Sequence, residues 1–169
     1  MRIYLIGYMG SGKTKTAELL SKIFKCDFVD TDHLVEEITG TTVTAIFKTK
    51  GQDYFREIEK NVLRSTVKKN SCVISTGGGT PCYFDNMEWM NAHGITVYLE
   101  TNAGLLFHRL ATSRSGRPLI ESLDDVELME QIMSHLVVRN PVYKQSMISV
   151  NAASLNVKEL ADKIKALNK

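Results

Sequence analysis

The sequence lacks the features that mark several large classes of protein. Its three cysteines, Cys26, Cys72 and Cys82, are odd in number and widely spaced, with no Cys-x-x-Cys or Cys/His pattern, which argues against disulfides and zinc sites. No apolar run is long enough to span a membrane and no apolar signal segment follows the N-terminus, so we expect a cytoplasmic protein. A net charge of only +2 favours neither nucleic acid nor a membrane surface as a partner.

What the sequence does contain is an alternation of short β-rich runs and longer helical patterns. This order predicts an α/β fold with a mostly parallel sheet covered by helices. Strands are expected at 2–6, 26–29, 72–75, 96–100 and 147–150. The clearest helical pattern is the C-terminal stripe of Val157, Leu160, Ile164 and Leu167, with Asn156 and Glu159 as its cap.

Two stretches exceed this minimal alternation. Residues 33–70 are too many for a single crossover helix, and residues 112–125 form a polar stretch typical of a lid. The chain of 169 residues contains no repeat, low-complexity tract or linker, so we expect a single domain, 1–169.

Residues 7–14, GYMGSGKT, match the phosphate-binding pattern G-x-x-x-x-G-K-[ST] between a predicted strand and a predicted helix. Glycines let consecutive backbone N–H groups approach phosphate oxygens, and the following helix adds the positive end of its dipole. Lys13 is expected to reach the β- and γ-phosphates, and Thr14 to ligate Mg²⁺. The nucleotide-binding positions predicted from this loop are Gly10, Ser11, Gly12, Lys13, Thr14 and Lys15.

The second predicted strand runs directly into Asp30-Thr31-Asp32. Ligands of parallel sheets bind beyond the carboxyl ends of the strands, so both carboxylates are expected near the phosphate loop. One carboxylate can hold the water shell of a metal ion while the other faces an acceptor hydroxyl. The alternative is that an aspartate here is only a helix N-cap.

Four further motifs stand in a characteristic order. They are Phe55-Arg56-Glu57-Ile58-Glu59, Ser75-Thr76-Gly77-Gly78-Gly79, Arg117-Pro118-Leu119 and Arg139-Asn140-Pro141-Val142-Tyr143. With the phosphate loop and the Asp-Thr-Asp motif, they make nearly the whole chain resemble the shikimate kinase family. The resemblance implies a five-stranded parallel sheet flanked by helices, of the P-loop NTPase and nucleoside-monophosphate-kinase type, with substrate-binding helices at about 33–62 and a lid at about 112–125.

The reaction implied by the resemblance is phosphorylation of the 3-hydroxyl of shikimate by ATP with Mg²⁺, on the route to chorismate and the aromatic amino acids. Asp32 is then expected to orient the hydroxyl and accept its proton. Lys13 and Arg117 are expected to neutralise the transferring phosphoryl group. Asp30 is expected to reach Mg²⁺ through water, because Mg²⁺ keeps much of its hydration shell.

Shikimate carries a carboxylate, and the matching guanidinium groups are those of Arg56 and Arg139, whose planar forks suit a carboxylate. If 53–67 is helical, Glu59 lies three residues after Arg56 and can hold it, although the same spacing also occurs in surface ion pairs.

Glycine residues 77, 78 and 79 (Gly77, Gly78, Gly79) have the family's place beside the substrate and leave its approach unobstructed. Phe47 and Phe55 match an apolar wall around the ring or pack in the core, and Glu36 matches a supporting position.

At the nucleotide end, Arg109 resembles the residue that stacks on adenine, with Arg114 as an alternative, and Asn151 approximates an adenine-loop position. Kinases for gluconate or a nucleoside monophosphate remain the alternatives within enzymes. A nucleotide switch is the alternative from another class, but the sequence lacks the N-K-x-D motif expected of a GTP-specific one. We expect a monomer whose partners are shikimate and ATP.

Overall fold

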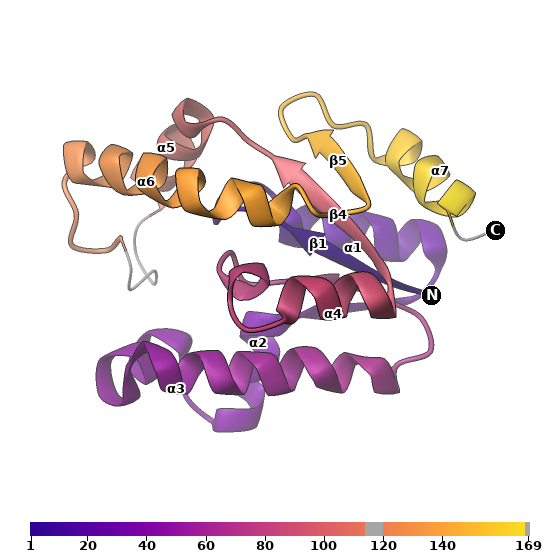
Figure 1. Cartoon of the computed structure of the whole chain (residues 1–169), viewed down its shortest axis with the longest axis horizontal. Coiled ribbons are helices and arrows are strands. Elements are labelled where there is room, and N and C mark those ends of the chain that lie inside the picture. The colour runs from indigo at the N-terminus through magenta and orange to yellow at the C-terminus, as the bar shows by residue number, and fades with distance from the viewer. Residues whose placement is uncertain (114–119, 168–169) are drawn as a thin grey trace.

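The computed structural model describes residues 1–113 and 120–167 (Figure 1). Its strands form one five-stranded parallel sheet in the order β2-β3-β1-β4-β5. The strands are β1 (Arg2–Ile6), β2 (Asp27–Asp30), β3 (Cys72–Ser75), β4 (Ile95–Glu100) and β5 (Ile148–Asn151). All five predicted strands are confirmed, and their ends differ from the prediction by no more than one residue.

Helices cover both faces of this sheet. They are α1 (Lys13–Phe24), α2 (Thr31–Thr39), α3 (Val43–Ser65), α4 (Asn86–His93), α5 (Ala103–Ala111), α6 (Asp125–Tyr143) and α7 (Val157–Leu167). Short 3₁₀ turns occupy 66–68 and 80–82. In Figure 1, α5 and the first turns of α6 extend beyond the carboxyl ends of the strands, whereas α7 and the N-terminus lie at the opposite end.

The core has two layers because neighbouring side chains of a strand point to opposite faces of the sheet. Ile3 and Leu5 of β1 pack with α1 and α7, whereas Tyr4 and Ile6 pack with α3, α4 and the end of α6. All four side chains are fully buried, as expected for a central parallel strand covered on both faces.

The predicted C-terminal helix is confirmed as α7. Asn156 accepts hydrogen bonds from the backbone N–H groups of Lys158 and Glu159, at 3.0 and 3.4 Å. Leu160 and Ile164 are buried as the stripe predicts, but Leu167 is 56% exposed because the helix ends beyond the edge of the core.

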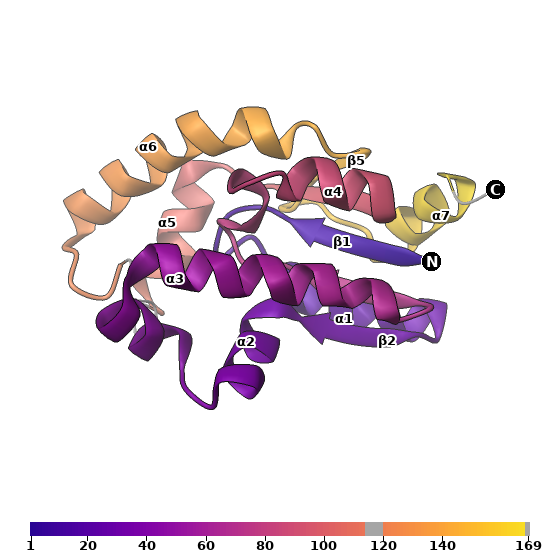
Figure 2. The ribbon, with the colours of Figure 1, turned by 60° about the horizontal axis from the view of Figure 1, so that its bottom comes forward.

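The region between β2 and β3 contains α2 and α3, which pack on each other through Val35, Ile46, Phe55 and Val62. Figure 2 shows α2 and the first turns of α3 extending from the β2 side of the sheet. Helix α3 is interrupted at Gly51, whose φ of 82° leaves the helical region. Helices α2 and α3 correspond to the helices expected at about 33–62.

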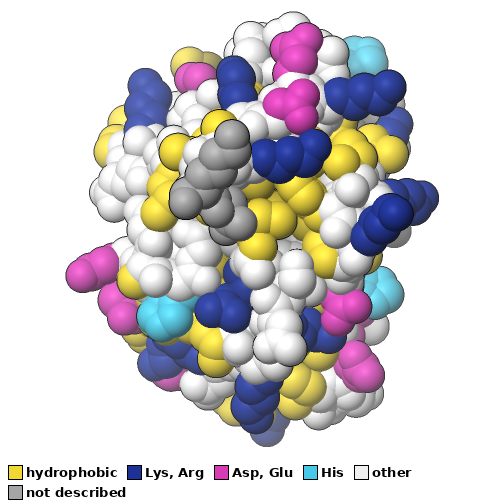
Figure 3. Space-filling model, turned by 90° about the vertical axis from the view of Figure 1, so that its right-hand side faces the viewer, with side chains coloured by type: hydrophobic (Ala, Val, Ile, Leu, Met, Phe, Trp, Pro, Cys, Tyr) yellow, Lys and Arg dark blue, Asp and Glu magenta, His cyan; other side chains and the backbone are white. Residues whose placement is uncertain are grey.

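The predicted lid at 112–125 is described only in part, because 114–119 lie outside the described residues. The stretch ends where Asp124 and Glu127 form a capping box that begins α6. None of the helices in the described ranges is long and apolar enough to cross a membrane. Figure 3 shows the end of the molecule that carries the N-terminus and α7, where basic, acidic and apolar side chains are interspersed.

Candidate active site

The phosphate loop joins β1 to α1 at the carboxyl end of the central strand. Gly12 precedes α1 with a φ of 96°, in the left-handed region that favours glycine. The Lys13 side chain is buried, and its ammonium donates to the carbonyl oxygens of Gly7 and Tyr8, both at 2.9 Å. The lysine therefore folds back onto its own loop, in which Ser11 is buried and Lys15 is exposed.

Three oxygen-bearing side chains meet beside this cradle. Thr14 Oγ1 donates to Asp30 Oδ2 at 3.0 Å and lies 3.2 Å from Ser75 Oγ, so α1, β2 and β3 each contribute one group. Hard oxygen donors of this kind are those that Mg²⁺ prefers, with water completing its shell. The donor set therefore fits a magnesium ion, and Ser75 is a member that the sequence did not single out as a ligand.

Asp30 has a second role at the start of α2. Its other carboxylate oxygen accepts from the backbone N–H groups of Asp32 and His33, at 3.1 and 3.5 Å. The sequence left open whether an aspartate here caps a helix or serves a metal site. The geometry assigns the cap to Asp30 and leaves the side chain of Asp32 directed into a cavity.

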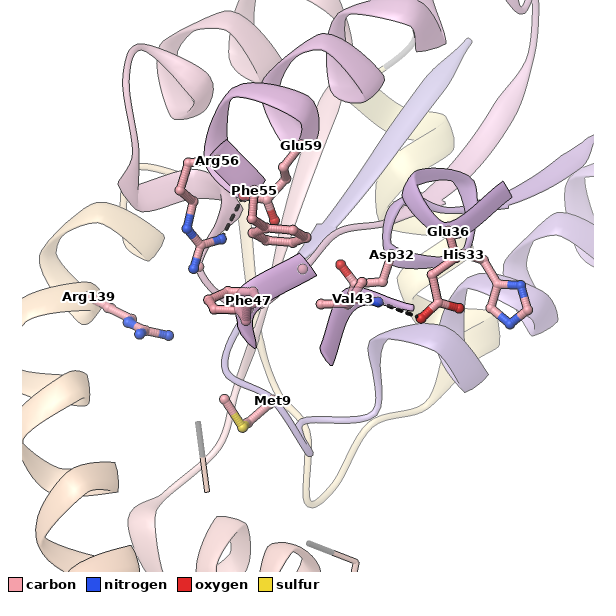
Figure 4. A pocket seen from close by; sticks show the side chains of 13 residues that line it. Met9, Asp32, His33, Glu36, Val43, Phe47, Phe55, Arg56, Glu59 and Arg139 are labelled. Carbon is pink, nitrogen blue, oxygen red and sulfur yellow. Dashed lines mark hydrogen bonds and ion pairs between the residues drawn. The ribbon is translucent and has the colours of Figure 1, made fainter. Parts of the chain in front are cut away.

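That cavity has a volume of about 300 Å³ and opens next to the phosphate loop (Figure 4). It brings together side chains and glycines from α2, α3, α6 and the segment after β3. The sequence-predicted residues that line it are Asp32, Phe47, Phe55, Arg56, Glu59, Gly77, Gly78, Gly79 and Arg139. Residues separated by more than 100 positions in the chain thus share one small space.

Arg56 and Glu59 form a buried ion pair at one side of the cavity. Arg56 Nη1 donates to Glu59 Oε2 at 2.6 Å, and Thr80 Oγ1 donates to the other carboxylate oxygen, also at 2.6 Å. Both charged side chains are buried, so this is not the surface ion pair that the sequence left possible. Arg56 Nε is buried without a hydrogen-bond partner in the described part of the chain, as expected for a group that serves a ligand.

The ion pair leaves no room for a side chain at two of the glycines after β3. A Cβ added to Gly77 would lie 2.6 Å from Glu59 Oε1, and one added to Gly79 would lie 2.6 Å from Arg56 Nη2. From the sequence we expect the three glycines to leave a ligand free to approach the backbone. The structure shows in addition that Gly77 and Gly79 are in contact with the ion pair itself. Gly78 is held by α6, because the hydroxyl of Tyr143 at the end of that helix donates to the Gly78 carbonyl oxygen.

Arg139 enters the cavity from α6 and is also buried. Its guanidinium carbon lies 5.4 Å from the centre of the Tyr8 ring, and Figure 4 shows the Arg56 and Arg139 side chains pointing toward the same space. The rings of Phe47 and Phe55, 4.7 Å apart, form an apolar wall beside them. The space therefore offers two guanidinium groups and an apolar surface to one ligand.

Asp32 stands at the mouth of the cavity with its side chain exposed to solvent, yet the surrounding protein removes enough of its hydration to raise the pKa of the carboxyl to about 7. The neighbouring charges of Glu59 and Asp30 act in the same direction, against Lys13 and Arg56. Solvent still reaches the side chain through the cavity and screens part of this repulsion. A carboxyl that titrates near neutral pH is suited to accept a proton at that pH.

Four residues that line the cavity were not among the predicted binding residues: Met9, His33, Glu36 and Val43. Glu36 Oε1 accepts from the Val43 N–H at 2.9 Å and closes the α2–α3 connection, and its supporting role at the site stays a prediction. His33 and Met9 adjoin predicted residues in the sequence, and this adjacency is the signal that could have identified them. Nothing in the sequence pattern identifies Val43.

The residues predicted at the adenine end, Arg109 and Asn151, lie in two different places, and the contact of each with the nucleotide stays a prediction. Arg109 Nη1 donates to the Gly10 carbonyl oxygen at 2.9 Å, so the structure places this residue on the phosphate loop. Asn151 instead lines a separate hollow of about 360 Å³ with Tyr98, Glu100 and Asn140, on the α6 side of the sheet. Arg114 and Arg117 lie outside the described residues.

Comparisons with known proteins agree with this geometry. The family model described as "Shikimate kinase" matches residues 9–168. A protein named shikimate kinase from Bacteroides thetaiotaomicron is 41% identical over 92% of this chain and 89% of its own length. A second, from Phocaeicola vulgatus, is 43% identical over 86% of this chain and 83% of its own length.

Solved structures give the same result. The crystal structure of shikimate kinase from B. thetaiotaomicron has a TM-score of 0.90 and 37% sequence identity, and the match covers 99% of this chain and 98% of that one. A structure of shikimate kinase from Acinetobacter baumannii in complex with shikimate has a TM-score of 0.88 and 32% identity, covering 99% and 92% of the two chains.

Proposed function

This chain belongs to the shikimate kinase family and phosphorylates shikimate, and we propose that it does so by transferring the γ-phosphoryl group of ATP to the 3-hydroxyl. The observation that carries the mechanism is that one cavity beside the phosphate loop contains Asp32 together with Arg56 and Arg139. A carboxylated polyol that pairs its carboxylate with the two arginines can direct a hydroxyl toward Asp32.

The acceptor is held at its carboxylate. Arg56 and Arg139 come from α3 and α6, and each presents a planar fork able to donate two parallel hydrogen bonds. The apolar wall of Phe47 and Phe55 covers the ring. Binding energy from this end fixes the distance between the hydroxyl and the phosphate, which is the main requirement of phosphoryl transfer.

Asp32 acts on the hydroxyl. Its carboxylate accepts the hydroxyl proton as the oxygen forms its bond to the γ-phosphorus and the bond from that phosphorus to the bridging oxygen breaks, which releases ADP. Because the pKa of Asp32 is raised to about 7, the carboxyl is ionised for much of the neutral range yet basic enough to take the proton.

The donor is held by the phosphate loop. Lys13 rotates from its two carbonyl contacts to the phosphates, and Arg117 from the proposed lid at 112–125 joins it in neutralising charge. Thr14, Asp30 and Ser75 would hold Mg²⁺, in part through water, and the ion when bound neutralises phosphate charge. We further propose that the chain acts as a monomeric single domain in the cytoplasm.

Replacement of Asp32 by asparagine tests this assignment. The Asp32→Asn variant is expected to bind ATP as the wild type does and to lose about 10²-fold or more in kcat, because the amide cannot accept the proton. An assay that couples ADP release to a colour change, run with shikimate, gluconate and AMP, measures both turnover and acceptor choice. An unchanged kcat contradicts the role of Asp32, and turnover of AMP without turnover of shikimate contradicts the proposed reaction.

A further inference from the structure

Tyr8 lies within the phosphate loop, but its side chain points away from the nucleotide end and toward α6. Its backbone carbonyl oxygen accepts from Lys13 at 2.9 Å. Its hydroxyl lies 2.9 Å from His135 Nδ1, and the guanidinium carbon of Arg139 lies 5.4 Å from its ring centre. One residue therefore contacts the lysine of the donor end and the arginine of the acceptor end.

The Tyr8 ring cannot easily take another position. It is 1% exposed and packs with Leu106 and Leu110 of α5 and with Ile132 and Leu136 of α6. Protein interiors are close-packed, so a ring that turned away would leave a cavity between these helices.

The two groups that Tyr8 contacts on α6 are one helical turn apart. His135 and Arg139 stand at i and i+4 and so share a face of the helix. The Tyr8 hydroxyl contacts His135, and the face of its ring contacts the guanidinium of Arg139. Together the two contacts fix the position of this part of α6 along its axis and its rotation about that axis. Burial raises the pKa of the Tyr8 hydroxyl and lowers that of His135, so the contact joins a neutral phenol to a neutral imidazole at neutral pH.

We propose that Tyr8 is a positioning residue for the acceptor substrate, which holds the guanidinium of Arg139 in place relative to the phosphate loop. This inference rests on the proposed role of Arg139 in binding the carboxylate. Its consequence is that the loop that binds the donor phosphates also sets the position of the acceptor. A displacement of about 1 Å in such an arrangement is enough to slow transfer strongly.

Two substitutions separate the contacts of Tyr8. Tyr8→Phe keeps the ring beneath Arg139 and removes the bond to His135, whereas Tyr8→Leu removes both. We expect kcat/KM for shikimate to fall about threefold in the first and about tenfold or more in the second, with the KM of ATP changed less than about twofold. Tyr4→Phe is the matched control, because it removes a buried hydroxyl that lies 3.2 Å from Thr66 Oγ1, in the short turn after α3. It should leave both kinetic constants unchanged.

A double-mutant cycle shows whether Tyr8 acts through Arg139. In an Arg139→Ala background, Tyr8→Phe should no longer change kcat/KM for shikimate. The same loss in both backgrounds, or an equal rise in the KM of ATP, overturns the proposal and indicates a disturbed phosphate loop. Tyr8→Phe keeps the test usable if Tyr8→Leu does not fold. Wild-type protein that fails to turn over shikimate contradicts the proposed function instead, whereas active wild type with unaffected Tyr8 variants contradicts this inference alone.

Discussion

Replacing Glu59 by glutamine should weaken both the fold and the acceptor site. The Glu59 carboxylate is fully buried and accepts two hydrogen bonds of 2.6 Å, from Arg56 and from Thr80. Glutamine has the same shape, but it is neutral and must turn an N–H group toward one of these donors. Removing one partner of a buried ion pair costs about 3–5 kcal/mol. Because Arg56 also borders the cavity, we expect a loss of about 3 kcal/mol in the free energy of unfolding.

Urea unfolding followed by circular dichroism measures this loss, which should lower the midpoint without changing the slope. Glu57→Gln is the matched control. Glu57 pairs with Lys60 at 2.7 Å in the same helix and with the same i, i+3 spacing, but it is 54% exposed. An exposed pair contributes about 0–1 kcal/mol, so the control should remain close to wild type. Equal effects of the two substitutions refute the claim that burial makes the Arg56–Glu59 pair important.

The same substitution has a second readout in the pH profile. After burial, the charge of Glu59 is the largest influence that raises the pKa of Asp32 to about 7. In the wild type, kcat/KM for shikimate should fall as the pH drops through that value, because Asp32 takes up a proton and can no longer act as a base. In Glu59→Gln the pKa of Asp32 is lower, so the fall should occur at a lower pH. An acid limb that stays in place would show that Asp32 and Glu59 are not coupled.

Two further predictions concern the neighbouring groups. Gly79→Ala places a methyl group 2.6 Å from Arg56 Nη2. Steady-state kinetics should therefore show a loss of about tenfold or more in kcat/KM for shikimate, with little change in the KM of ATP. An equal change in both constants would contradict a local effect on the guanidinium. Thr14→Val removes one of the oxygen donors proposed for Mg²⁺. The Mg²⁺ concentration that gives half-maximal activity should therefore rise by about tenfold or more. An unchanged titration would exclude Thr14 as a ligand.

The sheet and the phosphate loop could be predicted closely because their signals are local. A central parallel strand is buried on both faces and therefore appears as an apolar run, as in 2–6 and 72–75. The start of α7 is equally local, since Asn156 caps it through groups only two and three residues away.

The character of the Arg56–Glu59 pair could not be predicted in this way. The spacing of three residues predicts a contact whether the pair is exposed or buried, and Glu57 and Lys60 show the same spacing at the surface of the same helix. The difference is made by the segment after β3, where Thr80 bonds to Glu59 and Gly79 leaves room for Arg56. That segment lies more than 20 residues away, so only the tertiary structure distinguishes the two pairs.

The face of the sheet on which Asn151 lies follows from the sequence of β5. Side chains alternate along a strand, and Ile148 and Val150 of β5 pack on the α1 and α7 side of the sheet. Asn151 must then face the opposite side, toward α6, which is where the structure places it. The alternation of side chains along a strand therefore predicts which face of the sheet a residue lies on, although it does not predict which helix packs on that face.

The two arginines of the proposed acceptor site come from different helices, yet both are fixed by segments that follow neighbouring strands. Arg56 is held through Glu59 by Thr80, after β3, and α6 is held by Tyr143 on Gly78, also after β3. A further contact to α6 comes from the loop after β1, the strand next to β3 in the sheet. The positions of the two arginines thus depend on the carboxyl ends of two adjacent strands, so changes in the outer parts of α3 and α6 should disturb them less than changes in these short segments.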